Sequence, residues 1–385
     1  MKTSTKLLVF LAAALCASAF GQNRSRPPAG DGAQNGSSPV AYVYVSSSPG
    51  NGKYLIMAYA ANSSGELTPV AGSPFAAKGT AMALTSKWFF TTNGVDIYTS
   101  SISSTGALKP VSSINAQKHN AGDSGGPDLL FLDHTGSTLY DWDFNSEGTG
   151  NNSYQSFDVD SHTGALSYTG ATSASASFYG SLSFIGDNKD AYGGSCYHGT
   201  PVLYGFSRSA SGTLTDLNLN PPIPPAPPGK GAYCPGSIAA DRTNHFAVPL
   251  TPNNDMAVDG PTQLGVFAAE SSGTLTTTST NKNMPTPETG VYDLWASPSG
   301  LLLAVGGNGL EVFHFNGANP ITKYTGLLTT DNIVQVFWDN DNHLYALSAS
   351  ANKLFVFTVT PTSFSRAPGS PYTISSPVAL AVLPE

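Results

Sequence analysis

Apolar and polar residues alternate in short runs along the chain, and the runs recur in one order from residue 40 onward. Each copy has two apolar strands joined by a short polar turn, a loop, a strand ending in an aromatic residue, and a final strand containing Gly-x-Leu. Runs of this length and composition, separated by Gly/Asn/Asp turns, predict β-hairpins. The Gly-x-Leu units stand at 65–67, 106–108, 164–166, 212–214 and 273–275, with degenerate copies near Pro320 and Ser363.

The number and spacing of the copies indicate the architecture. Seven copies between residues 40 and 385 give about 49 residues each, which is typical of one four-stranded blade of a β-propeller. No helical periodicity interrupts them, which argues against a parallel α/β fold, and a linear solenoid would need capping repeats. We therefore predict an all-β fold, a seven-bladed β-propeller of four-stranded antiparallel blades. Blades 2 to 7 are expected near 79–115, 128–172, 178–218, 236–280, 290–328 and 332–373.

The two ends of the repeat region complement each other. The region begins at a second strand, Ala41 to Val45, and finishes on an orphan first strand, Val378 to Val382. We expect these segments to pair within blade 1 and close the ring, because closure removes two open sheet edges.

The N-terminal segment reads as an export signal. Lys2 and Lys6 precede the apolar run Leu7 to Cys16, and Ala17-Ser18-Ala19 has the small-x-small pattern of a cleavage site. The run is too short for a membrane span, and bulky Leu15 argues against the lipoprotein alternative at Cys16. We predict a signal peptide at 1–19, a flexible tether at 20–39 and the propeller at 40–385, in a secreted or periplasmic protein without membrane insertion after cleavage.

Charge narrows the class of partner. Only 11% of residues are charged, and loss of Lys2 and Lys6 with the signal would lower the net charge from −8 to −10. A chain this acidic is a poor partner for nucleic acid. We expect a monomer that binds a small molecule or an envelope partner.

Two cysteines remain after the predicted cleavage. Cys196 and Cys234 are 38 residues apart and fall on the same face of adjacent predicted blades. In an oxidising compartment we expect a disulfide between them, with two buried free thiols as the alternative.

A family resemblance rests on the recurring motifs. The aromatic-x-aliphatic strand, the Gly-x-Leu unit and the segment Ala71-Gly72-Ser73-Pro74-Phe75, echoed by residues 368–372, resemble the secreted lactonase-type (YVTN-like) seven-bladed propellers. The resemblance implies the fold and a family that includes 6-phosphogluconolactonase and carboxymuconate-lactonising enzymes. The WD40 and kelch signatures fit less well, because their residues fall on the wrong strands or are incomplete.

The two faces of the predicted propeller differ in loop length. In a blade with strands A to D, the A–B and C–D turns lie on one face, here the short-turn face. The B–C and D–A loops lie on the other, here the long-loop face, and they are lengthened mainly around blades 3 to 5. Long loops on a rigid scaffold often carry function. We therefore predict a ligand pocket at the mouth of the central channel on the long-loop face, walled by blades 3 to 5.

The candidate catalytic and binding residues are polar side chains in these loops. His119 or His198 would act as general base beside Asp123, Asp143 or Glu288. The binding candidates are Lys118, Glu147, Tyr197, Asp255 and Asp259. By contrast, His134, His245 and His343 fall in short turns, where we expect exposed side chains.

Two further patterns are given structural readings. Gly122 to Pro127 matches the segment around the serine of trypsin-like proteases, but no matching His segment precedes it, so we interpret it as a linker. Asp141, Asp143, Asn145 and Glu147 alternate as in a calcium loop, yet the Gly and terminal Glu of an EF-hand do not follow. We predict neither a metal nor a cofactor.

Arginine, the usual clamp for phosphate or carboxylate, is scarce. Past residue 40 the chain has only Arg208, Arg242 and Arg366. Two function classes follow from the sequence. We expect a binding or scaffold module of the cell envelope, with a lactonase-like hydrolase of a small cyclic ester as the alternative.

Overall fold

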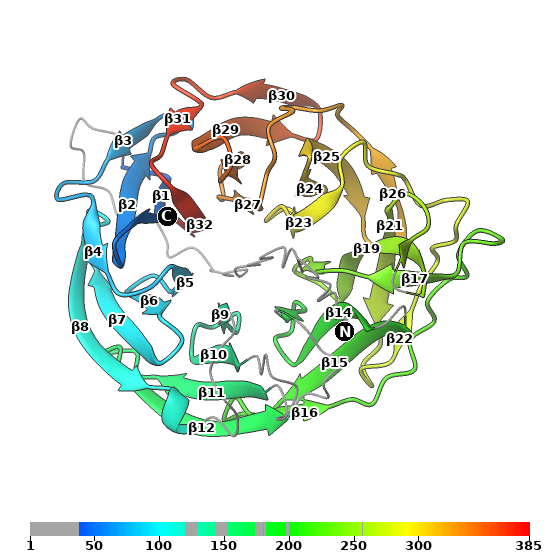
Figure 1. The fold of residues 1–385 in the computed structure, drawn as a ribbon, viewed down its shortest axis with the longest axis horizontal. Helices are drawn as coiled ribbons and strands as arrows, with labels where there is room; N and C mark the ends of the chain where they lie inside the picture. Colours follow the sequence, from blue (N-terminus) through cyan, green and yellow to red (C-terminus); the bar gives the residue numbers. More distant parts are fainter. Residues whose placement is uncertain are drawn as a thin grey trace, which may run out of the picture.

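Seven antiparallel sheets are arranged as a ring in the computed structural model, which describes residues 38–119, 129–143, 153–173, 180, 182–197, 200–255 and 257–385 (Figure 1). The side chains of residues 143, 173 and 197 are not described. In each sheet one end strand lies nearest the centre and the others follow outward. The seven-bladed propeller predicted from the repeats is confirmed.

In blades 1 to 4 the strands follow one another from the centre of the ring outward. Blade 1 has β32 (Pro377–Pro384), β1 (Ala41–Gly50), β2 (Lys53–Ala61), β3 (Leu67–Pro69) and β4 (Phe75–Ala77); blade 2 has β5 (Ala81–Leu84), β6 (Trp88–Thr92), β7 (Asp96–Ile102) and β8 (Leu108–Asn115). Blade 3 has β9 (Leu129–Leu132), β10 (Thr138–Asp143), β11 (Ser153–Val159) and β12 (Leu166–Ser173); blade 4 has β13 (Ser183–Phe184), β14 (Asp190–Tyr197), β15 (Thr200–Arg208) and β16 (Leu214–Asp216).

Blades 5 to 7 follow the same order. Blade 5 has β18 (Ala239–Ala240) and β17 (Ala232–Pro235), both on β19 (His245–Asn254), then β21 (Gln263–Ala269) and β22 (Leu275–Thr276), with β20 (Ala257–Val258) also on β19. Blade 6 has β23 (Val291–Ala296), β24 (Leu302–Gly307), β25 (Gly309–Asn316) and β26 (Asn319–Lys323); blade 7 has β27 (Gln335–Trp338), β28 (His343–Ser348), β29 (Lys353–Thr360), β30 (Ser363–Arg366) and β31 (Tyr372–Thr373).

The ring closes through the pairing expected from the two ends of the repeat region. The C-terminal strand β32 lies antiparallel to β1, with Val382 opposite Val43 and Leu380 opposite Val45. Beyond the last pair, the backbone N–H of Glu385 donates to the carbonyl of Val40 at 2.9 Å. The N-terminal and C-terminal segments therefore complete one blade together.

The core is distributed between the blades rather than within them. Seven clusters of buried apolar side chains occur among the described residues, each shared by two neighbouring blades. The cluster of the closing joint combines Val43 of blade 1 with Val356 of blade 7. Both faces of a blade are therefore apolar, which explains why the strands read as nearly continuous apolar runs.

The Gly-x-Leu repeat has a structural cause at these joints. The Tyr44 hydroxyl, on blade 1, donates to the carbonyl of Gly106, on blade 2, at 3.0 Å. A Cβ at Gly106 would lie 2.3 Å from the ring of Tyr42, and its φ of 79° is in the left-handed region that favours glycine. Tyr140 and Tyr192 make the same bond to Gly212 and Gly273. The repeated glycine thus lets the C–D turn of one blade approach the preceding blade.

The Ser-Pro segments of the family resemblance also have a defined role. Ser73 Oγ accepts a hydrogen bond from the backbone N–H of Ala58, and Ser370 Oγ accepts one from that of Val356, both at 2.9 Å. Each hydroxyl continues the outer strand of its blade where backbone pairing is interrupted.

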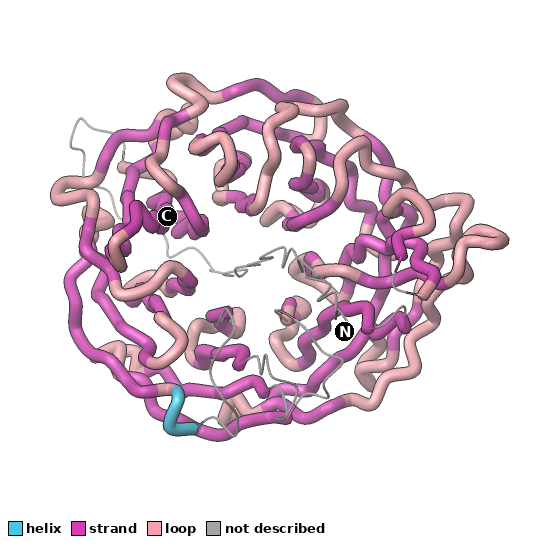
Figure 2. Tube along the Cα trace, viewed as in Figure 1, coloured by secondary structure: helices cyan, strands magenta, loops and turns pink. Residues whose placement is uncertain are grey.

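Helical structure is almost absent from the part of the chain that the structure describes. It is limited to the 3-10 turn η1 (Gln117–His119), coloured cyan in Figure 2. No helix among these residues is long and apolar enough to cross a membrane.

Candidate functional site

Five residues proposed from the sequence have no described side chain. Asp123, Glu147 and His198 lie outside the described residues. Asp143 and Tyr197 end β10 and β14, and only their backbone is described. For these residues the assignment stays a prediction.

Lys118 and His119 lie on η1, which Figure 2 places at the outer rim of the ring rather than at its centre. The imidazole of His119 stacks on the ring of Tyr168, on the outermost strand of blade 3, with centroids 3.8 Å apart and planes 6° from parallel. Phe157 contacts it edge-on. The surroundings of His119 are those of a packed surface histidine.

The acidic candidates of blades 5 and 6 are also separate from one another. Asp255 is exposed near the tip of the β19–β20 hairpin, and Asp259 pairs with Lys230 at 3.2 Å. Glu288 pairs with Lys323, which is also 3.5 Å from Glu311. No hydrogen bond, ion pair or ring contact joins any two of the five candidates with described side chains.

The disulfide expected from the sequence is present. Cys196 on β14 is bonded to Cys234 on β17, with Cα atoms 5.1 Å apart. It connects blades 4 and 5 on the long-loop face and encloses the proline-rich segment 221–228.

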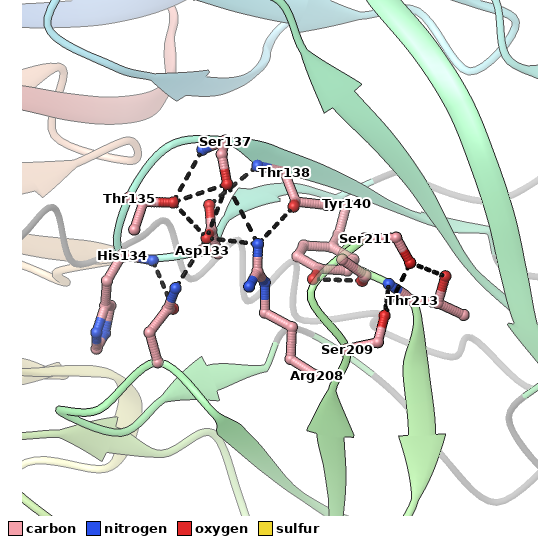
Figure 3. Close-up of polar contacts among 12 residues, drawn as sticks. Asp133, His134, Thr135, Ser137, Thr138, Tyr140, Arg208, Ser209, Ser211 and Thr213 are labelled. Atoms are coloured by element: carbon pink, nitrogen blue, oxygen red, sulfur yellow. Dashed lines mark hydrogen bonds and ion pairs between the residues drawn. The ribbon is translucent and has the colours of Figure 1, made fainter.

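The short-turn face carries a dense polar joint between blades 3 and 4 (Figure 3). Asp133, with a fully buried side chain, forms an ion pair with Arg208 at 2.9 Å and accepts hydrogen bonds from Asn188 Nδ2 and the backbone N–H of Thr138. Arg208 Nη2 also donates to Thr138 Oγ1 at 2.8 Å. The guanidinium is therefore engaged within the fold, and we interpret this cluster as structural.

The expectation of exposed turn histidines was wrong: His134 and His245 are half-buried, and His343 is buried. Its side chain is only 1% exposed, and Nδ1 lies 2.7 Å from Asp339 Oδ2, which also accepts a hydrogen bond from the Tyr345 hydroxyl at 2.8 Å. Gly65 of blade 1 packs against this imidazole. The turn is short, but the neighbouring blade covers it, and that neighbour cannot be seen in the local sequence.

Polar side chains do gather on the long-loop face between blades 6 and 7. We define the axial cluster as Tyr292, Asn308, Asp331, Asn332 and Lys353. The Tyr292 hydroxyl donates to Asn308 Oδ1 at 3.0 Å, and Asn332 Nδ2 lies 3.5 Å from the same oxygen. Lys353 Nζ pairs with Asp331 Oδ2 at 2.8 Å. All five side chains are at least partly exposed, so a ligand could reach them.

The backbone explains why these residues meet. Tyr292 is on β23, the innermost strand of blade 6, and Asn308 is the single residue between β24 and β25. Asn332 precedes β27, the innermost strand of blade 7, which contacts β23. Lys353 begins β29 directly after the B–C turn of blade 7. The cluster therefore lies on the long-loop face between blades 6 and 7 and extends from the first residues of the inner strand β23 outward to the third strand β29.

A buried carboxyl lies next to this cluster. Asp293 follows Tyr292 on β23, is 2% exposed, and accepts a hydrogen bond through Oδ2 from the backbone N–H of Val336, on β27, at 2.9 Å. No donor among the described residues bonds its Oδ1. Burial raises the pKa of Asp293 to about 7, partly offset by backbone hydrogen bonds from Val336 and Leu294.

Gln335 makes a comparable bond in the next blade with a neutral side chain. Its Oε1 accepts from the backbone N–H of Leu380, on β32, at 2.5 Å. Asp293 and Gln335 each lie four residues before the first residue of their A–B turn, Ser297 and Asp339. A carboxyl is therefore not required for this structural role.

Sequence reasoning missed the axial cluster because its residues sit in ordinary turn positions. Asn308 lies in Gly-Asn-Gly, which is typical of any tight hairpin. One signal was present: Asp293 interrupts the otherwise uncharged strand Val-Tyr-Asp-Leu-Trp. An acid in the middle of a buried strand is costly unless it is compensated or used.

Comparisons by sequence identify no relative: no family model matches the chain, and no curated protein does. Solved structures do match. The periplasmic gluconolactonase of Pseudomonas aeruginosa is 16% identical, covers 89% of this chain and 99% of its own, and gives a TM-score of 0.63. A candidate 6-phosphogluconolactonase of Bacteroides uniformis is 12% identical, with coverages of 90% and 100% and a TM-score of 0.66.

A third solved structure has the same fold. A candidate 6-phosphogluconolactonase of Bacteroides fragilis is 14% identical, with coverages of 91% and 100% and a TM-score of 0.60. The fold is that of the lactonase-type propellers. At these identities the likeness concerns the fold alone, so the resemblance noted in the sequence is confirmed at that level.

Proposed function

We propose that the protein is an exported lactonase-like hydrolase that opens a small cyclic ester at the axial cluster. The observation that carries the proposal is the gathering of a carboxylate, an ammonium group, two amides and a phenol on the long-loop face between blades 6 and 7. The similarity to gluconolactonase-type structures supports a cyclic ester as the substrate. The disulfide and the likeness to a periplasmic protein are consistent with export.

The cluster offers the groups that ester hydrolysis needs. Asp331 would accept a proton from a water molecule as the water oxygen bonds to the ester carbonyl carbon. Lys353 Nζ would stabilise the negative charge that develops on the carbonyl oxygen. When the ring C–O bond breaks, the proton passes from Asp331 to the departing alkoxide, which leaves a hydroxy acid.

Binding would rest on the neutral members. The amides of Asn308 and Asn332 and the hydroxyl of Tyr292 can each donate or accept hydrogen bonds. Such groups suit the several hydroxyls of a sugar-derived lactone. Tyr292 lies near the start of β23 and Asn308 in the tight turn between β24 and β25, and such positions hold a side chain more firmly than long loops would.

The test is hydrolysis of a lactone panel by the purified chain from residue 20, followed by acid release at constant pH. We expect turnover of at least one sugar lactone above the buffer rate, and a higher KM for Asn308→Ala. The matched control is Asn319→Ala, an exposed asparagine at the outer strand of the same blade. No turnover on any lactone, with binding of none, would refute the proposal.

A further inference from the structure

The charges in and around the axial cluster determine whether it can bind a lactone that carries a phosphate group. Its one cation, Lys353, is already paired with Asp331 at 2.8 Å, and the two side chains are 40% and 30% exposed. The cluster's formal charges therefore cancel, and the buried acid Asp293 follows Tyr292 on β23. A phosphate group entering here would find no unpaired cation within the cluster.

The charged residues that the structure describes around the axial cluster supply no unpaired positive charge either. Between blades 5 and 6, Lys323 is shared by Glu288 and Glu311, which leaves that group net negative. Arg208 is engaged with Asp133 on the opposite face, and Arg366 lies over the rings of Phe355 and Phe357 on the outer strand β30. Arg242 lies in the A–B turn of blade 5, also on the opposite face, with Nη2 3.5 Å from Asn340 Oδ1. No arginine of the described residues is therefore available to clamp a phosphate at the axial cluster.

Two lysines of blade 1 need separate consideration. Lys53 begins β2, the third strand from the axis, and Lys78 lies in the linker that follows β4; both are exposed on the long-loop face. Lys53 therefore has the same strand position in blade 1 as Lys353 has in blade 7, but no ion pair among the described residues joins Lys53 or Lys78 to the axial cluster. Substituting both lysines therefore tests whether a phosphate binds outside the cluster.

We propose that the axial cluster is selective for unphosphorylated sugar lactones and discriminates against their phosphate esters. The inference rests on the proposed function, because it assumes that the cluster is the lactone site. Its physical basis is the neutralised Lys353: a dianionic phosphate loses its hydration on binding and here gains no compensating charge. Neutral hydroxyls meet amides and a phenol, with which they can exchange hydrogen bonds.

The test compares two ligands that cannot be hydrolysed. 1,5-Anhydroglucitol keeps the sugar ring without the ester carbonyl, and its 6-phosphate adds the charge. Isothermal titration calorimetry on the chain from residue 20 should give at least tenfold weaker binding for the phosphate. Asp331→Asn frees Lys353, and we expect it to increase affinity for the phosphate at least tenfold. The double variant Asp331→Asn/Lys353→Met should lose that gain.

The outcomes separate the two proposals. If the native protein binds the phosphate as tightly as the neutral ligand, or if Lys53→Ala/Lys78→Ala weakens phosphate binding, the inference is overturned while the lactone site stands. If neither ligand binds and no lactone is hydrolysed, the proposed function fails, and the inference fails with it. Because the Asp331–Lys353 pair is partly exposed, its removal should cost little stability, so the variants should fold.

Discussion

The carboxyl of Asp293 accepts a hydrogen bond from the backbone N–H of Val336 at 2.9 Å, and this bond ties the inner strand of blade 6 to that of blade 7. The comparable bond from Gln335 to Leu380 ties blade 7 to blade 1 without a titratable group. The acid at position 293 therefore affects stability in a way that its counterpart does not.

Asp293→Asn should stabilise the protein at neutral pH. The folded-state pKa of about 7 is above the ordinary value of 3.8, so the folded state binds the proton more tightly than the unfolded state does. The stability of the native protein should therefore fall as pH rises from about 4 to 7 and then level off. The variant keeps an acceptor for Val336 and should gain roughly 2–4 kcal/mol above pH 7, and little at pH 4.

Urea unfolding from pH 4 to 8 measures this difference, with Gln335→Glu as the reverse change in the neighbouring blade. That variant should lose stability as pH rises. Equal stability of native protein and Asp293→Asn at every pH would show that the buried carboxyl carries no ionisation cost.

The sequence predicted the fold well because the pattern that specifies it is local and repeated. Strand runs, Gly-x-Leu turns and the incomplete blade at each end are visible within single segments, and the pairing of segments 41–45 and 378–382 followed from counting strands. Contacts between blades are different, because they join residues far apart in the chain. Tyr44 and Gly106 are 62 residues apart, and Asp293 and Val336 are 43 apart. The burial of His343 and the assembly of the axial cluster depend on such contacts.

Closure should be essential for the fold. Deleting residues 376–385 removes β32, the inner strand of blade 1, and leaves β1 with an open edge at the ring's gap. We expect loss of the cooperative thermal transition in circular dichroism. A deletion protein that melts cooperatively at the native temperature would contradict the role of this pairing.

Gly106→Ala should destabilise the joint between blades 1 and 2. The new methyl group would meet the ring of Tyr42 at 2.3 Å, on a backbone with φ of 79°. We expect a loss of roughly 2–4 kcal/mol in free energy of unfolding, from strain and displaced packing. Gly52→Ala is the control, since its φ is similarly positive at 68° but nothing lies within 4 Å; it should cost only about 1–2 kcal/mol. Equal losses would mean that the tyrosine contact is unimportant.

The disulfide between blades 4 and 5 should stabilise the folded protein. Native chain from residue 20, denatured without reductant, should show no reaction of Cys196 or Cys234 with a thiol reagent. Replacing both by Ala should lower stability by up to roughly 4 kcal/mol, because the bond restrains a 38-residue separation in the unfolded chain. Labelling of both thiols in unreduced protein would rule the bond out.

The central claim is that Asp331 serves as the base of a lactone hydrolase, and its most direct test is kcat/KM for glucono-1,5-lactone at pH 7. We expect native protein to exceed the buffer rate and Asp331→Asn to lose at least about 100-fold, the contribution typical of a general base. His119→Ala should retain native kcat/KM because its imidazole stacks on Tyr168 at the outer rim, and His198→Ala tests the remaining histidine proposed from the sequence. Full activity in Asp331→Asn, or its loss in His119→Ala, would contradict the claim.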